Sequence, residues 1–247
     1  MIHLVEPIEE LKKICRKETN GGTLKGRMVR KVSIYVTKLL LSLGLSADQT
    51  TLLRIFFGIL AGLIYTYGTP IYLVIASLLL GFSGILDFCD GEVARYRGKP
   101  KFPGVYVDSL GHWILSPFIY ACISFGIYNV FRSEIIFIFG FSTVISVLMY
   151  WVVTAWVYYF SHHEPLFNIP TDETMTTKFY QIFSKIRKYQ GGLFLIPIIS
   201  LIDTVFPHLI IGSNTFSLLY IYIIMCGIVT PFFWISYIHG VLTLDNK

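Results

Sequence analysis

Six apolar blocks dominate this 247-residue sequence, and each is long enough to cross a lipid bilayer. They cover about residues 47–67, 71–89, 104–128, 133–160, 191–207 and 214–240. A helix of roughly 20 apolar residues spans the hydrocarbon core and satisfies its own backbone polar groups there. Only 14% of the residues are charged, against about a quarter in soluble domains. The sequence therefore predicts an all-α integral membrane protein with six transmembrane helices, and it excludes an ordinary soluble enzyme or a nucleic-acid-binding domain.

The first 46 residues form a basic region that lacks the apolar core of a signal peptide. An apolar stripe recurs at helical spacing along Met28, Val32, Val36, Leu39 and Leu43, and four basic residues lie largely off it: Arg27, Arg30, Lys31 and Lys38. This pattern predicts an amphipathic helix in the plane of the membrane interface, where basic residues contact anionic lipid headgroups. A similar stripe at Phe179, Ile182, Phe183 and Ile186 predicts a second interfacial helix between the fourth and fifth spans.

Positive charge alternates between the segments that connect the spans. Residues 1–46 carry nine Lys and Arg residues, and the connections after the second and fourth spans carry four each. The other three connections carry one Arg residue between them. Because basic loops stay in the cytosol, we expect both termini on the cytosolic side of a multi-pass protein. Its predicted organisation is an interfacial region 1–46, a membrane domain 47–240 and a cytosolic tail 241–247.

Acidic residues gather where the second span ends and the third begins. At roughly 1.5 Å per residue, Asp87 lies about 24 Å from the outer end of its helix, near the cytosolic boundary of the membrane. By the same geometry Asp108 and His112 lie about 6 and 12 Å into the third span, at a similar depth. Asp87 and Asp90 share one helical face, and so do Asp108 and His112. Carboxylates at this depth are costly, so a divalent cation bound by hard ligands is the simplest compensation; a hydrated loop is the alternative.

These residues carry a resemblance to a known family. The pattern Asp-x-x-Asp-Gly-x-x-Ala-Arg, eight residues, then Gly-x-x-x-Asp-x-x-x-Asp is the signature of the CDP-alcohol phosphatidyltransferases. This sequence matches it, with the same gap, at Asp87, Asp90, Gly91, Ala94, Arg95, Gly104 and Asp108. His112 stands where the family has its fourth aspartate. Residues 46–51 resemble, more loosely, a second family stretch at the start of the first span.

The resemblance implies an enzyme of phospholipid or related phosphodiester synthesis. It transfers a phosphate-linked alcohol from a CDP-linked donor to a hydroxyl acceptor and releases CMP. By the same resemblance, Mg²⁺ or Mn²⁺ is held by Asp87, Asp90, Asp108 and His112, the last two also being catalytic. The CDP moiety would contact Asp48, Gln49, Thr51, Asp87, Asp90, Gly91, Arg95 and Lys101. The resemblance also implies a homodimer with a cytosolic active site.

Several alternatives stay open on the sequence alone. Asp48 can serve as the N-cap of the first span instead of contacting nucleotide, and Arg54 can face the acidic cluster or extend to the headgroups. Asp203 is expected to be hydrated or paired with His208. His112 can be the general base and a metal ligand, can only orient substrate, or can mark an impaired, CDP-binding family member. Its missing negative charge should weaken a second metal ion.

A polytopic transporter is the rival from another class, since acids within a membrane also mark ion pathways. The acceptor and the tail of the CDP donor are not encoded in any recognisable motif. Inositol phosphate, glycerol phosphate, serine and a lipid hydroxyl all fit a basic cytosolic pocket.

Overall fold

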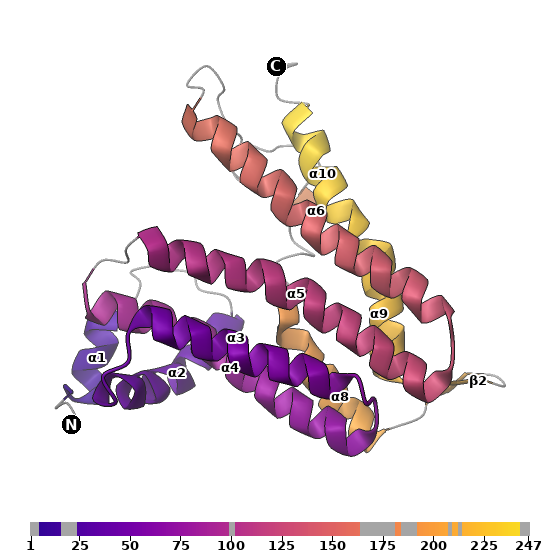
Figure 1. Ribbon diagram of the computed structural model, residues 1–247, viewed down its shortest axis with the longest axis horizontal. Coiled ribbons are helices and arrows are strands. Elements are labelled where there is room, and N and C mark those ends of the chain that lie inside the picture. The colour runs from indigo at the N-terminus through magenta and orange to yellow at the C-terminus, as the bar shows by residue number, and fades with distance from the viewer. Residues whose placement is uncertain are drawn as a thin grey trace. The chain divides into compact units, whose positions relative to one another are not determined.

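Helices make up nearly all of the chain that the computed structural model describes, which is residues 5–15, 24–98, 102–163, 181–183, 192–206, 209–211 and 214–242. In chain order the helices are α1 (Ile8–Cys15), α2 (Leu24–Ser42), α3 (Ala47–Tyr65), α4 (Pro70–Tyr96), α5 (Phe102–Phe131), α6 (Ile135–His163), the 3₁₀ helix η1 (Gly192–Phe194), α8 (Leu195–Val205), α9 (Leu218–Val229) and α10 (Pro231–Leu242) (Figure 1). One antiparallel hairpin joins β1 (Leu209–Ile211) to β2 (Asn214–Phe216), with Leu209 opposite Phe216.

Five helical stretches among these residues are long and apolar enough to cross a membrane: Ala47–Tyr65, Pro70–Tyr96, Tyr106–Phe131, Ile135–Val157 and Leu218–Leu242. They correspond to the first four predicted spans and the sixth, so the all-α, multi-pass membrane class is confirmed. The fifth predicted block holds η1 and the 11-residue helix α8, which is about 16 Å long and too short to span the core alone. A total of six spans stays a prediction.

The last span begins later than predicted. Residues 214–216 form β2, and helix α9 starts at Leu218. The hydroxyl of Ser217 caps the helix by accepting a hydrogen bond from the backbone N–H of Tyr220 at 3.0 Å. Oδ1 of Asp203 accepts another from the N–H of Leu218 at 2.7 Å. Asp203 therefore helps to fix a helix start, a structural role; His208 lies outside the described residues.

The chain divides into two compact units, and α3, α4 and α5 each contribute residues to both. The first unit comprises Met1–Ala61 and Leu78–Leu115. Its core is a cluster of buried side chains from α1, α2 and α4: Leu11, Cys15, Ile34, Leu40, Leu41, Leu86, Cys89 and Val93. This unit contains the residues of the acidic motif.

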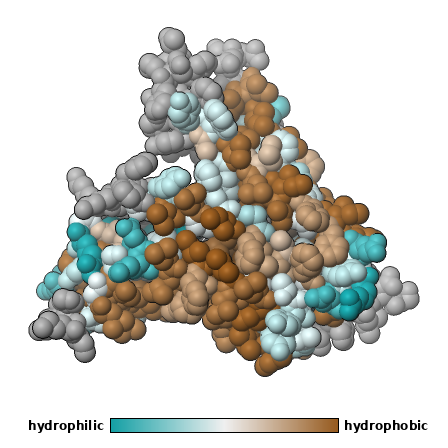
Figure 2. Space-filling view, in the orientation of Figure 1, coloured by the Kyte–Doolittle hydropathy of each residue, from teal (hydrophilic) through white to brown (hydrophobic). Residues whose placement is uncertain are grey.

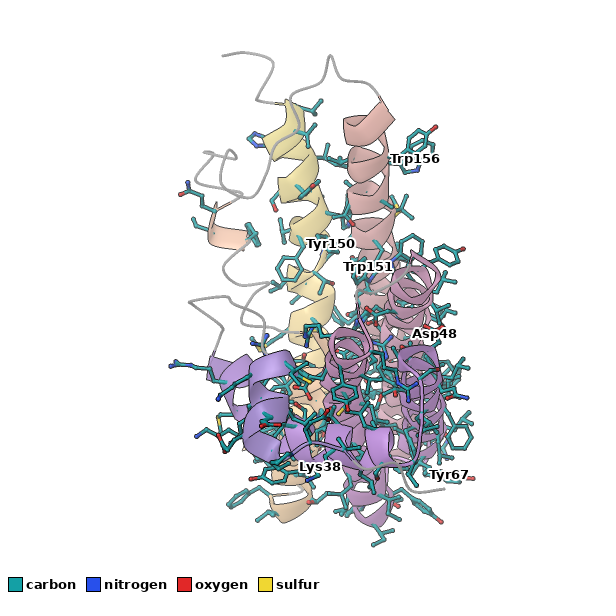
Figure 3. The ribbon with its side chains drawn as sticks, turned by 90° about the vertical axis from the view of Figure 1, so that its left-hand side faces the viewer. Lys38, Asp48, Tyr67, Tyr150, Trp151 and Trp156 are labelled. Atoms are coloured by element: carbon teal, nitrogen blue, oxygen red, sulfur yellow. The ribbon has the colours of Figure 1, made fainter. Side chains whose placement is uncertain are left out.

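The second unit comprises Gly62–Ser77 and Ser116–Lys247. Within it, α6 packs along α9 and α10 (Figure 1). A Cβ at Gly227 would lie 2.5 Å from the carbonyl oxygen of Phe139, so the backbones of α9 and α6 approach closely, as small residues allow in membranes. Tyr150 of α6 packs edge-on against Tyr237 of α10, while Trp156 points outward (Figure 3). Hydrophobic residues cover most of the face displayed in Figure 2, as lipid-facing helices require.

Helix α2 carries the apolar stripe that the sequence predicted, with one correction. Its exposed apolar residues are Met28, Val32, Tyr35 and Leu39, and exposed Leu43 follows directly after the end of the helix. Val36 was expected on this stripe, but it is half-buried and packs against the core of the first unit. Tyr35 takes its place because the stripe follows the helix surface that the core leaves uncovered. Placement of α2 at a membrane interface stays a prediction. The second predicted interfacial helix lies outside the described residues, apart from residues 181–183.

Candidate active site

Three ligand-bearing side chains converge where α4 and α5 meet in the first unit. Asp87 of α4 and Asp108 and His112 of α5 each offer one ligand atom, and these atoms all lie within 4.8 Å of one another. Nε2 of His112 is 3.1 Å from Oδ1 of Asp87 and 3.7 Å from Oδ1 of Asp108. The i, i+4 spacing brings His112 and Asp108 to one face of α5. The structure therefore brings together three of the four residues predicted to hold metal.

Arg54 of α3 lies at the centre of this cluster. Its side chain is 2% exposed, and Nη1 forms ion pairs with Asp87 and, at 2.9 Å, with Asp108. Nη2 donates a hydrogen bond to the backbone carbonyl of Asp108 at 2.9 Å. The sequence left open whether Arg54 extends to the headgroups, and the structure shows that it faces the acids. No motif marked this residue; its basic character within an apolar span was the only signal.

A glycine makes room for this guanidinium on the neighbouring helix. A Cβ at Gly111 would overlap Nη2 of Arg54 and approach Ile55. The hydroxyl of Ser83 on α4 donates to the backbone carbonyl of Arg54 at 2.9 Å, which ties α3 to α4 at the same level. The position of Arg54 is thus fixed by both neighbouring helices.

His112 contacts two groups that favour opposite protonation states of its Nε2. Nε2 lies 3.0 Å from Nη1 of Arg54, and a guanidinium can only donate, so this contact suits an Nε2 without a proton. The 3.1 Å contact with the Asp87 carboxylate suits a protonated Nε2. The same nitrogen is therefore placed to accept a hydrogen bond in one protonation state and to donate one in the other.

Asp90 is not one of the three residues whose ligand atoms lie within 4.8 Å of one another. It is buried, and its Oδ2 accepts a hydrogen bond from the hydroxyl of Thr51 on α3 at 3.2 Å. Thr51 was predicted on the nucleotide side, and the structure places its hydroxyl against a motif carboxylate.

The start of α3 corrects one prediction and explains a motif glycine. Ser46, not Asp48, is the N-cap, since Oγ of Ser46 accepts from the N–H of Gln49 at 3.2 Å. Oε1 of Gln49 accepts from the N–H of Ser46 at 2.8 Å, which completes a capping box and gives Gln49 a structural role. The carboxylate of Asp48 instead lies against α5, where a Cβ at Gly104 would be 2.8 Å from it.

Arg95 folds back over Gly91 on the last turns of α4. A Cβ at Gly91 would lie 3.3 Å from Nη1 of Arg95, so the glycine lets the guanidinium approach the backbone. Nε of Arg95 donates to the carbonyl oxygen of Cys15 at 2.7 Å. Lys101, the remaining predicted CDP contact, lies outside the described residues.

Glu92 was not singled out from the sequence, although it lies inside the motif. Its side chain is buried and accepts hydrogen bonds from Ser33 at 2.7 Å and Thr37 at 2.6 Å. Both hydroxyls belong to α2, at i, i+4 spacing, so one carboxylate fastens α2 to the helix that carries the motif. The sequence feature that accompanies Glu92 is a pair of hydroxyl residues on the inner face of an amphipathic helix. This pair can be assigned to Glu92 only once the docking of α2 is known.

The donor set suits a divalent cation of the hard type. The two carboxylates of the group within 4.8 Å supply the oxygen ligands that suit Mg²⁺ and Mn²⁺, whereas the imidazole is a softer ligand than these ions prefer. Arg54 supplies the positive charge among the same oxygens, so a bound ion and this guanidinium would compete for them.

Two known proteins are similar to part of this chain. The chain is 33% identical over 94 residues to the bifunctional IPC transferase and DIPP synthase of Archaeoglobus fulgidus, which covers 38% of this chain and 18% of the relative. It is 32% identical over 113 residues to the protein of that name from Thermococcus kodakarensis, which covers 43% and 25%. The matched part therefore spans a quarter or less of these relatives.

Among solved structures, the phosphatidylinositol phosphate synthase of Mycobacterium tuberculosis with CDP-DAG bound aligns with 86% of this chain and 94% of its own, at 15% identity and a TM-score of 0.49. The family profile described as CDP-alcohol phosphatidyltransferase matches residues 45–242, most of the sequence. The predicted family is confirmed: this chain belongs to the CDP-alcohol phosphatidyltransferases.

Proposed function

We propose that this protein transfers a phosphate-linked alcohol, a phosphatidyl or similar group, from a CDP-alcohol to a hydroxyl acceptor. The acceptor oxygen bonds to the phosphorus that carries the alcohol, the bond from that phosphorus to the CMP phosphate breaks, and CMP leaves. The acceptor's proton passes to a base. The observation that carries the proposal is the convergence of Asp87, Asp108 and His112 within 4.8 Å in a chain of this family.

His112 is the proposed base. Its Nε2 lies within hydrogen-bonding range of both Arg54 and Asp87, so the proton it takes would be stabilised by the carboxylate. General base catalysis of this kind contributes about 10²- to 10⁴-fold. Arg95, held over Gly91, would pair with the donor pyrophosphate and favour charge development on the leaving CMP.

Asp87, Asp108 and Asp90, from the same face of α4 as Asp87, are the proposed carboxylate ligands of Mg²⁺ or Mn²⁺, and His112 is the proposed nitrogen ligand. Because a metal-bound imidazole nitrogen has no lone pair for a proton, the roles of ligand and base require the two different ring nitrogens of His112. A bound divalent cation would supply positive charge to the pyrophosphate oxygens. A second ion should bind more weakly, because His112 replaces a carboxylate. Asp48 and Thr51 remain the proposed contacts on the nucleotide side, together with Lys101.

For the membrane topology, we propose that the site faces the cytosol, with both termini on that side. The alternation of basic connections supports this orientation. We also propose a homodimer, by analogy with the family alone. Cysteine accessibility on each side of sealed vesicles and crosslinking in membranes test these two points.

The test of function is CMP release by the purified protein in lipid vesicles with Mg²⁺. CDP-diacylglycerol and a small CDP-alcohol serve as donors, each with inositol phosphate, glycerol phosphate, serine or a lipid alcohol. Asp108→Ala should abolish release, whereas Glu134→Ala, which removes an exposed acid of the second unit, should leave it unchanged. If CDP binds but no pair turns over, the protein is a binding-only family member. Ion flux without CDP binding favours the transporter.

A further inference from the structure

The last turns of α4, which carry the motif arginine, are held by residues that precede the family match. The family profile begins at residue 45. Nε of Arg95 donates to the carbonyl of Cys15, the last residue of α1, at 2.7 Å. The hydroxyl of the adjacent Tyr96 donates to Glu6. Two neighbouring residues of the motif helix thus take their partners from residues 6–15.

Helix α1 is docked firmly enough to hold a partner in place. Leu11 is 0% exposed and Cys15 3% exposed, and both belong to the core cluster of the first unit. Burial, beside the carboxylate of Glu92, raises the pKa of Cys15 to about 11, so its thiol stays neutral. The hydrogen bond from Tyr96 lowers the pKa of Glu6, so the carboxylate that accepts it is ionised at neutral pH.

The acceptor at the end of α1 suits a guanidinium. The last carbonyls of a helix have no partner within the helix, and the helix dipole adds negative potential there. One N–H of Arg95 is used by this carbonyl, while Nη1 and Nη2 lie over Gly91. A side chain fixed at Nε presents its Nη donors in one direction, and so loses less rotamer entropy when an anion binds.

From these contacts we propose that α1 is a positioning element of the active site. By docking through Leu11 and presenting the Cys15 carbonyl to Arg95, it holds the Nη groups ready for the donor pyrophosphate. Glu6 and Tyr96 fasten the segment that precedes the helix. The inference rests on the proposed function, because it assigns Arg95 to the CDP-linked donor.

The experiment compares Leu11→Ala with Ile14→Ala, a matched change on the same helix at a residue that is 45% exposed. Leu11→Ala should raise KM for the CDP donor about 10-fold, which corresponds to about 1.4 kcal/mol, and leave KM for the acceptor unchanged. Ile14→Ala should leave both unchanged. Tyr96→Phe, which keeps the ring and removes one hydrogen bond, should shift donor KM in the same direction by a smaller factor.

A double-mutant cycle separates positioning from general loss of structure. If α1 acts through Arg95, then Leu11→Ala should change donor KM little once Arg95→Ala is present. Equal multiplicative losses in both backgrounds would overturn the proposal, and so would an unchanged donor KM in Leu11→Ala. In either case CMP release by the parent protein would still support the proposed function.

Should the parent release no CMP with any donor, the proposed function fails, and CDP binding with Mg²⁺ becomes the readout for α1. Weaker CDP binding by Leu11→Ala than by Ile14→Ala would then still support positioning. Equal binding by the two variants, or no CDP binding by the parent, would overturn it.

Discussion

Replacing Arg54 by methionine should make the stability of the protein depend on divalent metal. Arg54 is 2% exposed and pairs with Asp87 and Asp108, which are 31% and 41% exposed. Methionine fills a similar volume but leaves two carboxylates facing each other. Breaking a buried ion pair costs about 3–5 kcal/mol, and because these acids are partly solvated we expect about 3 kcal/mol. For a chain of this size that corresponds to a fall in Tm of about 6–12 °C.

The assay is thermal unfolding in detergent, with EDTA or with millimolar Mg²⁺. The parent should respond modestly to Mg²⁺, since Arg54 already neutralises part of the cluster. Arg54→Met should lose stability in EDTA and recover most of it with Mg²⁺, since a ligand that binds only the folded state stabilises it by mass action. Arg27→Met, an exposed change on α2, is the control. Equal Tm values for Arg54→Met in EDTA and in Mg²⁺ would refute the account of Arg54 as the charge that substitutes for metal.

Three further outcomes test the site at other points. Gly111→Ala should reduce CMP release about 10-fold, because the added Cβ displaces Arg54. Gly81→Ala, whose added carbon has nothing within 4 Å, should leave CMP release unchanged, and equal rates for the two variants would refute the contact between Gly111 and Arg54. His112→Ala should lose about 10²- to 10⁴-fold in turnover, whereas His112→Asp should keep activity and bind Mn²⁺ more tightly. If the turnover of both variants matches that of the parent, His112 is not the base. Glu92→Ala should lower stability by about 2–4 kcal/mol, since two buried hydroxyls lose a charged partner, and Glu92→Gln by about half as much; unchanged Tm values would contradict the bonds to α2.

The central cluster could be predicted because the motif and the helix repeat impose the same geometry. Spacing of i, i+4 places Asp108 and His112 on one face wherever α5 lies, and the depth of Asp87 follows from counting residues along α4. The extent of the lipid-facing helices was similarly accessible, since it depends on hydropathy alone. Each of these features is local in sequence, or rests on two helices joined by a short connection.

What the sequence did not specify depends on how helices are rotated about their own axes. Between Leu52 and Ile64 the first span is apolar on all sides except for Arg54, so its hydropathy does not say which side faces α4 and α5. Glu92 could not be matched with Ser33 before the docking of α2 was known, and the Arg95–Cys15 contact joins residues 80 positions apart. The fifth apolar block is a different case, since hydropathy measures apolar content and not where a helix stops. Its helix ends at Val205, before the hairpin.

Charge balance connects the histidine of the motif with the arginine of the first span. When all three carboxylates are ionised, Asp87, Asp90 and Asp108 with Arg54 carry a net charge of two minus, which one divalent cation neutralises. A fourth aspartate at position 112 would leave a further charge and favour a second ion. A CDP donor brings negative charge of its own, so we expect the second ion to bind together with the donor, as linked binding requires. Mn²⁺ titration should give one site without CDP and two with it; two sites without CDP would show that His112 does not limit metal binding in this way.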